Sequence, residues 1–259
     1  MKVSAKVGSS HRTPGKHDAL SWLFGKTVGV HSVYFPKRTF VAIDCTAGDG
    51  VPSGHSLLTS PSILDKGVQF LESKGIHAKL ALYEKSAVSS QSLKFHFPNR
   101  DIVHGDAKEM PVFWDQTSIL FVVNDPNTIN DWVLPQSLNL APDLTTVFST
   151  LGCNVGGLKM LSKEKRSVWY EHVQSQLLLL KPWHAAYIIR IENDSSQWAY
   201  LVNSPVKWMR NTEDAFRKSF EKYGMKVDGG WIGERVADSS KFRNIVDQLF
   251  LTKKEFQNV

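Results

Sequence analysis

Four acidic side chains stand at the ends of four apolar, strand-like segments of the chain. Each acid is the last residue of its segment: Asp44 of 40–44, Glu84 of 77–84, Asp106 of 101–106 and Asp125 of 118–125. The carboxyl ends of parallel strands meet at one edge of a sheet, and ligands bind outside that edge. Because four carboxylates gathered there repel one another unless a ligand or cation engages them, the pattern predicts a ligand site.

A glycine-rich turn follows the first of these segments, and residues 44–50 read DCTAGDG. Gly48 and Gly50 allow the backbone to pass close to a ligand where a Cβ would collide with it. Ser53 occupies the position of the third glycine in the dinucleotide fingerprint, and the Lys-Ser/Thr pair of a phosphate-binding loop is missing. A phosphate cradle and a nucleotide-dependent oxidoreductase are therefore disfavoured, while a plain β-turn stays open as the alternative.

The other three acids each have a binding interpretation and a structural one. Glu84 offers two acceptor oxygens for the hydroxyls of a ribose, or it is a solvated acid at a helix start. Asp106 could accept a hydrogen bond from the amine of adenine, or it caps a helix. Asp125 and Pro126 could present a side-chain acceptor and a carbonyl at the pocket mouth, or form a common Asp-Pro turn.

Strands alternate with helices along the chain, which predicts an α/β fold with a mostly parallel sheet. Three more strands are expected at 145–150, 185–191 and 198–203, and helices at 19–25, 62–75, 85–95, 129–140, 162–180 and 212–223. Residues 1–18 are polar and basic and are expected to form a flexible N-terminal arm. Residues 19–259 are expected to form a single domain with an insertion at about 51–76.

The strand-end motifs together resemble those of the class I S-adenosylmethionine-dependent methyltransferases over roughly residues 37–205. This resemblance implies a Rossmann-like, doubly wound sheet, mostly parallel with an antiparallel strand near the C-terminus. It implies S-adenosyl-L-methionine as cofactor, with cofactor-binding residues Asp44, Thr46, Ala47, Gly48, Gly50, Glu84 and Asp106. It also implies catalytic positions at Asp125, Pro126 and Asn127, which would orient the methyl acceptor.

Within that superfamily the chain is most similar to the three-Cys-motif partner (TcmP) type. Lys16 to Leu20 match its K-H-x-x-L helix, and Tyr200–Pro205 match its late strand and turn. The motif at Asp125 departs from the amino-methylating enzymes, because Asn127 and Thr128 replace a proline and a base-stacking aromatic. Trp132 could substitute from the following helix, and the acceptor stays open.

Basic residues with aromatic neighbours indicate a polyanionic partner. The 259-residue chain has a formal net charge of +6, which favours such partners. Lys207, Trp208 and Arg210 could track phosphates and stack on bases, as could 181–184 and the arm. The alternatives are lysine stems that cover apolar surface and buried indoles.

Several classes of site and location are disfavoured. Cys45 and Cys153 are too few for a disulfide scaffold, and neither stands in the context of a cytosine-C5 nucleophile. The nine histidines show no metal-ligand spacing. No apolar run reaches the roughly 18–20 residues that cross a bilayer, so we expect a cytoplasmic protein without a membrane partner.

The sequence therefore predicts an S-adenosylmethionine-dependent methyltransferase that acts on nucleic acid, either DNA or RNA. The alternative is a catalytically inactive methyltransferase-fold module that binds cofactor or a protein partner within a modification or defence complex.

Overall fold

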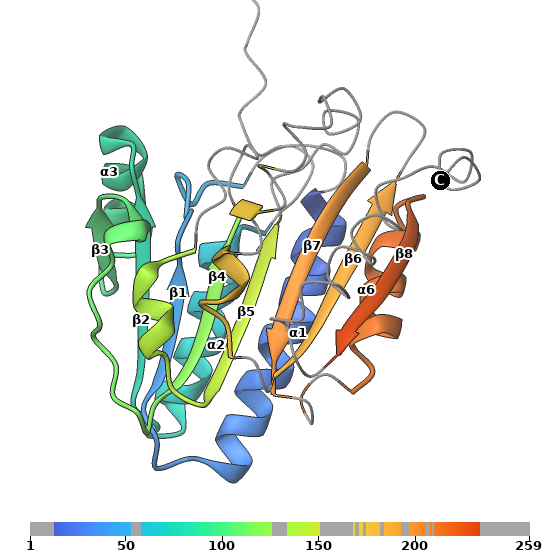
Figure 1. The fold of residues 1–259 in the computed structure, drawn as a ribbon. Coiled ribbons are helices and arrows are strands. Elements are labelled where there is room, and N and C mark those ends of the chain that lie inside the picture. Colours follow the sequence, from blue (N-terminus) through green and yellow to red (C-terminus); the bar gives the residue numbers. More distant parts are fainter. Residues whose placement is uncertain are drawn as a thin grey trace, which may run out of the picture.

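An eight-stranded sheet runs through the described part of the chain (Figure 1). The computed structural model describes residues 13–52, 58–125, 134–150, 168, 171–172, 175–181, 184–192, 197–205, 208 and 210–233. The strands are β1 (Phe40–Asp44), β2 (Ala78–Glu84), β3 (Asp101–His104), β4 (Ile119–Asn124), β5 (Leu144–Thr150), β6 (Ala185–Glu192), β7 (Gln197–Ser204) and β8 (Lys226–Gly233). They lie side by side in the order β3-β2-β1-β4-β5-β7-β6-β8.

Strands β1 to β5 are parallel to one another, whereas β7 runs antiparallel to both of its neighbours, β5 and β6. Strand β8 lies at the edge, antiparallel to β6. The predicted fold class is confirmed: the sheet is Rossmann-like, doubly wound and mostly parallel, with antiparallel strands toward the C-terminus. From β1 the chain builds β2 and β3 on one side and then crosses back to form β4 on the other side of β1, so the topological switch point lies between β1 and β4.

Side chains of alternating strand residues form a core on each face of the sheet. On β1, Phe40 and Ala42 belong to one core, while Val41 and Ile43 belong to the other. All five residues of β1 are buried, as expected for a parallel strand covered on both faces. No position on β1 faces water, so the carboxyl group of Asp44, the last residue of the strand, also lies in the interior.

Within the described residues, four α-helices and two short 3₁₀ helices accompany the sheet. They are α1 (Thr13–Tyr34), α2 (Ser60–Ser73), α3 (Ala87–His96), α6 (Thr212–Glu221), η1 (Ala107–Glu109) and η3 (Gln136–Leu140). Helix α1 packs against both α2 and α6. The start of α2 is fixed by a capping box between Thr59 and Ser62, and Gly75 with φ +71° follows the C-cap residue Lys74. None of the described helices is both long and apolar enough to cross a bilayer.

Helix α1 corrects two predictions. The sequence predicts a helix only at 19–25 and a flexible arm at 1–18, whereas α1 extends from Thr13 to Tyr34. The arm prediction is wrong for 13–18, because Lys16 contacts Asp125 and Asp18 contacts Lys222 of the segment after α6. Residues 1–12 lie outside the described part. Thr13-Pro14 is a helix-start signal that points to the true boundary.

Other boundaries differ in smaller ways. Strand β8 is not predicted, since its paired glycines, Gly229 and Gly230, are typical of a turn. The helix expected at 129–140 is described only as η3, and most of the one expected at 162–180 lies outside the described residues. The crossover from β1 to β2, which contains the predicted insertion at 51–76, carries α2.

The packing of α1 on α2 depends on a glycine. Phe24 of α1 is buried against the sheet, with its ring edge-on to Phe121 of β4 at 4.8 Å between centroids. A Cβ built on Gly67 of α2 would lie 2.3 Å from the Phe24 ring. The two helices therefore approach closely only because position 67 has no side chain.

Gly67→Ala should lower the free energy of unfolding by about 1–3 kcal/mol, because overpacking against Phe24 outweighs the gain in helix propensity. Urea unfolding measures the change. Gly25→Ala on α1 is the matched control, since no atom lies within 4 Å of its added Cβ, and it should stabilise the protein by about 0.5–1 kcal/mol. A stabilising Gly67→Ala would contradict this account of the interface.

Candidate active site

The carboxyl ends of β1 and β4 are joined through one threonine. Asp44 is the last residue of β1, and Asp125 directly follows β4. The backbone N–H of Thr46 donates to Asp44 Oδ1 at 3.0 Å, and the backbone N–H of Asp125 donates to Thr46 Oγ1 at 2.8 Å. The structure thus brings two of the predicted acids to the switch point, on neighbouring strand ends.

Asp44 is fully buried at the end of β1. Its Oδ2 has no hydrogen-bond partner among the described residues. Burial raises the pKa of Asp44 to about 6, and the negative charge of Asp125 acts in the same direction. Ser60, Thr46 and Lys16 oppose that rise because they stabilise the ionised form. Buried polar atoms are normally satisfied, so Asp44 Oδ2 is a candidate acceptor for a ligand at this edge of the sheet.

The glycine turn has one position that suits a ligand and one that serves packing. Gly48 has φ +66°, and a Cβ built on it would meet no atom within 4 Å. Gly50 has φ +70°, but its Cβ would lie 2.7 Å from Phe97 and 2.9 Å from Leu93. The predicted open space beside the backbone is therefore present at Gly48 but not at Gly50, where Leu93 of α3 and Phe97 fill it.

Glu84 connects the glycine turn to the start of α3. Its Oε2 accepts from the Gly48 N–H at 2.9 Å, and its Oε1 accepts from the Ser86 N–H at 2.7 Å. Each carboxylate oxygen has a second acceptor direction, so Glu84 could accept from two further donors. The neighbouring Ala47 is buried, and its N–H donates to the Tyr83 carbonyl at 3.0 Å. The turn is therefore held rigidly against β2.

The predicted adenine acceptor, Asp106, has local partners instead. It is the N-cap of η1, where its Oδ1 accepts from the Lys108 N–H at 3.0 Å. Its Oδ2 lies 3.0 Å from Lys85 Nζ. Although burial opposes its ionisation, these contacts hold the pKa of Asp106 below its ordinary value. The helix-cap interpretation is confirmed, and contact with adenine stays a prediction.

Asp125 is held by Lys16 of α1. Lys16 Nζ contacts Asp125 Oδ2, while Thr150 Oγ1 of β5 donates to Asp125 Oδ1 at 2.8 Å. Although burial opposes ionisation, Lys16 and Thr150 lower the pKa of Asp125. The adjacent His17 is buried, and burial together with the Lys16 charge lowers its pKa to about 4. His17 is therefore neutral at physiological pH.

Several predicted residues fall outside this cluster. Pro126 and Asn127 lie outside the described residues, as does Lys207. Trp208 is only 7% exposed and packs near Phe35 at 6.5 Å between ring centroids. The prediction that Trp208 stacks on a base is wrong for this reason: its indole is part of the core. Arg210 is exposed.

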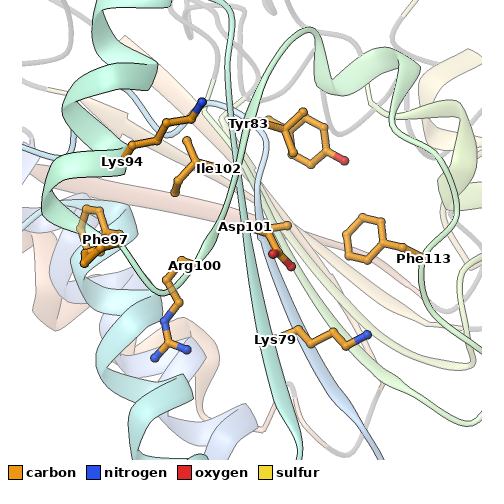
Figure 2. Close-up of a pocket in the computed structure, with 11 residues that line it drawn as sticks. Lys79, Tyr83, Lys94, Phe97, Arg100, Asp101, Ile102 and Phe113 are labelled. Carbon is orange, nitrogen blue, oxygen red and sulfur yellow. The ribbon is translucent and has the colours of Figure 1, made fainter.

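A hollow of about 530 Å³ lies elsewhere, along β2 and β3 at the edge of the sheet (Figure 2). Lys79, Tyr83, Phe97 and Phe113 are among the side chains that surround it. Arg100 also lines it, but its guanidinium is bound by Asp65 and Glu72. None of the switch-point acids contributes to this hollow, so we place the candidate active site at the ends of β1 and β4.

No protein-family model matches the chain, and no curated protein matches it either. Similar solved structures include the plantazolicin methyltransferase BpumL in complex with a pentazolic desmethylPZN analog and SAH, at 9% identity and TM-score 0.40 over 74% of this chain and 86% of that one. Cofactor-bound Rv0187 from MTB is 15% identical, with TM-score 0.39 over 78% of this chain and 93% of that one. The N-methyltransferase NodS from Bradyrhizobium japonicum WM9 is 7% identical, with TM-score 0.38 over 76% and 99%. Likeness at this level does not define a family for the chain.

Asp44→Asn should stabilise the protein above pH 6 and lose that advantage toward pH 4. A folded-state pKa raised above the unfolded value means that ionised Asp44 destabilises the fold, fully so above pH 6. The gain should be about 1–2 kcal/mol, since an amide at this position keeps the acceptor for Thr46 but buries an unpaired N–H. Urea unfolding at pH 7.5 and pH 4.5 measures it.

Asp101→Asn, at an exposed position on β3, is the control and should show no such pH-dependent gain. Equal destabilisation by Asp44→Asn at both pH values would contradict the assignment of a strained, buried carboxylate.

Proposed function

We propose that the chain is an S-adenosylmethionine-dependent methyltransferase, with its cofactor site at the carboxyl ends of β1, β2 and β4. The observation that carries this proposal is the fully buried Asp44, whose Oδ2 lacks a partner among the described residues, at the switch point of a doubly wound sheet. Open space beside Gly48 and the carboxylate of Glu84 lie along the same strand ends. Acidic acceptors fit a cofactor that presents an ammonium, a sulfonium and a ribose diol.

Each residue has a role that follows from its position. Asp44 Oδ2 accepts from the cofactor ammonium, and Gly48 lets the methionyl chain pass close to the backbone. The free acceptor directions of Glu84 take the ribose hydroxyls. The bound cofactor supplies an electrophilic methyl group, so the protein's task is to orient the acceptor and to exclude water.

Nucleic acid is the acceptor class that we propose, in line with the net charge of +6 and the exposed Arg210. A basic surface attracts phosphates without selecting a base. Trp208 has no part in this proposal because it is buried. The finer similarity to the three-Cys-motif partner type stays a prediction, and the Lys16-His17 pair of that motif lies in the site.

A cofactor-binding module without turnover is the second candidate. It is favoured by the partners of Asp125, whose oxygens are engaged by Lys16 and Thr150. A carboxylate held in this way is a weak base and is less available to an acceptor. In such a module the site would bind cofactor within a complex, and the protein partner would supply the activity.

Calorimetric titration of S-adenosylmethionine should show micromolar binding, weakened roughly 10- to 100-fold in Glu84→Ala. The loss follows from removing hydrogen bonds between a charged carboxylate and two hydroxyls. Glu109→Ala, at an exposed position of η1, is the matched control and should bind as the wild type does. Circular dichroism checks that Glu84→Ala remains folded, because Glu84 also holds the Gly48 and Ser86 N–H groups.

A folded wild type that does not bind S-adenosylmethionine would contradict the proposal. Where binding is found, transfer of a tritiated methyl group to DNA, RNA or protein separates the two candidates. Tritium incorporated into DNA or RNA supports a nucleic-acid methyltransferase. Cofactor binding without transfer to DNA, RNA or protein supports the cofactor-binding module.

A further inference from the structure

Lys16 brings a positive charge from the first turn of α1 to the ends of β1 and β4. Its side chain is 13% exposed and that of Asp125 is 22% exposed, so their contact is largely shielded from water. Thr150 holds the second oxygen of Asp125, which fixes the carboxylate between α1 and β5. Because Thr46 bonds to both Asp44 and Asp125, this ion pair is rigidly connected to the orphaned carboxylate.

The charges that face Asp44 can be assigned element by element. Asp125 at the end of β4 is negative, and Lys16 of α1 is positive. His17, also on α1, is neutral at physiological pH because its pKa is lowered to about 4. Cys45 beside Asp44 remains a neutral thiol since burial raises its pKa, and Ser60 of α2 is uncharged. With Lys16 and Asp125 cancelling, the group carries a single net negative charge, located on Asp44.

We propose that Lys16 is a positioning residue for the ammonium group of the cofactor: its pairing with Asp125 leaves Asp44 free to ionise and to accept from that ammonium. This inference rests on the proposed function. Without the lysine, two buried carboxylates at neighbouring strand ends would compete for ionisation. The less hydrated one, Asp44, would retain its proton, and the cofactor ammonium would lose its counterion.

The electrostatics of Asp44 agree with this arrangement. Burial is the largest cause of its raised pKa, Asp125 raises the pKa further, and Lys16 lowers it. Removing Lys16 or Asp125 should therefore move the ionisation of Asp44 in opposite directions. Such a pair of opposite shifts distinguishes charge compensation from a purely structural anchor for α1.

The test is a ¹³C NMR titration of the Asp44 carboxyl group in the ligand-free protein, with the resonance assigned through Asp44→Asn. Lys16→Met should raise the Asp44 midpoint by about one pH unit, Asp125→Asn should lower it, and Lys16→Arg should restore the wild-type value. Lys26→Met is the matched control, since Lys26 lies on the same helix but contacts the Arg210 carbonyl. It should leave the midpoint unchanged.

The second measurement is the affinity for S-adenosylmethionine between pH 5.5 and pH 8. Lys16→Met should bind roughly tenfold more weakly near pH 6.5, with a smaller loss at pH 8 where Asp44 ionises without help. An unchanged Asp44 midpoint in Lys16→Met overturns this inference, even where the wild type binds cofactor and the proposed function stands. If Lys16→Met does not fold, an unlowered midpoint in Asp125→Asn overturns it. Absence of binding by the wild type overturns the proposed function itself.

Discussion

A carboxylate removed from water at the end of β1 is the constraint on which the rest of the site depends. An isolated buried charge is costly unless hydrogen bonds and opposite charge compensate it. The fold supplies the Thr46 N–H and Ser60 next to Asp44, and it brings Lys16 from α1 to offset Asp125. The position of α1 is thus tied to the chemistry of the strand ends, and its packing against α2 and α6 keeps that cation in place.

The same groups serve both the backbone and the proposed ligand. Glu84 receives the N–H groups of Gly48 and Ser86, so it ties the glycine turn to β2 and α3 before any ligand arrives. Thr46 plays the corresponding part between β1 and β4. Rigid contacts of this kind hold acceptors in place in advance, which reduces the entropy lost when a ligand binds. Substitutions at these positions therefore alter stability and binding together.

Stability and the proposed cofactor binding are opposed at the switch point. Asp44 lies in an environment that disfavours its ionised form. Its Oδ2 also has no hydrogen-bond partner among the described residues, which further destabilises the fold. Asp125 is in the opposite condition, since Lys16 and Thr150 favour its charge. Neighbouring carboxyls in environments that separate their pKa values are typical of functional sites. The asymmetry between these two acids is what distinguishes this sheet edge from an ordinary group of strand-end acids.

The sequence by itself determined the fold class and the strand-end positions of the acids. A parallel strand that is buried on both faces is an uninterrupted apolar run in the sequence. Asp44 and Asp125 each follow such a run, so each marks a strand end that can be recognised from the sequence. Tertiary structure alone decided which acids are satisfied locally, as with Asp106, and which indole is buried, as with Trp208. It also brought Lys16 to Asp125 across 109 residues of chain. Local periodicity indicates which faces of a helix or strand are buried, but it does not indicate which elements distant in sequence will be in contact.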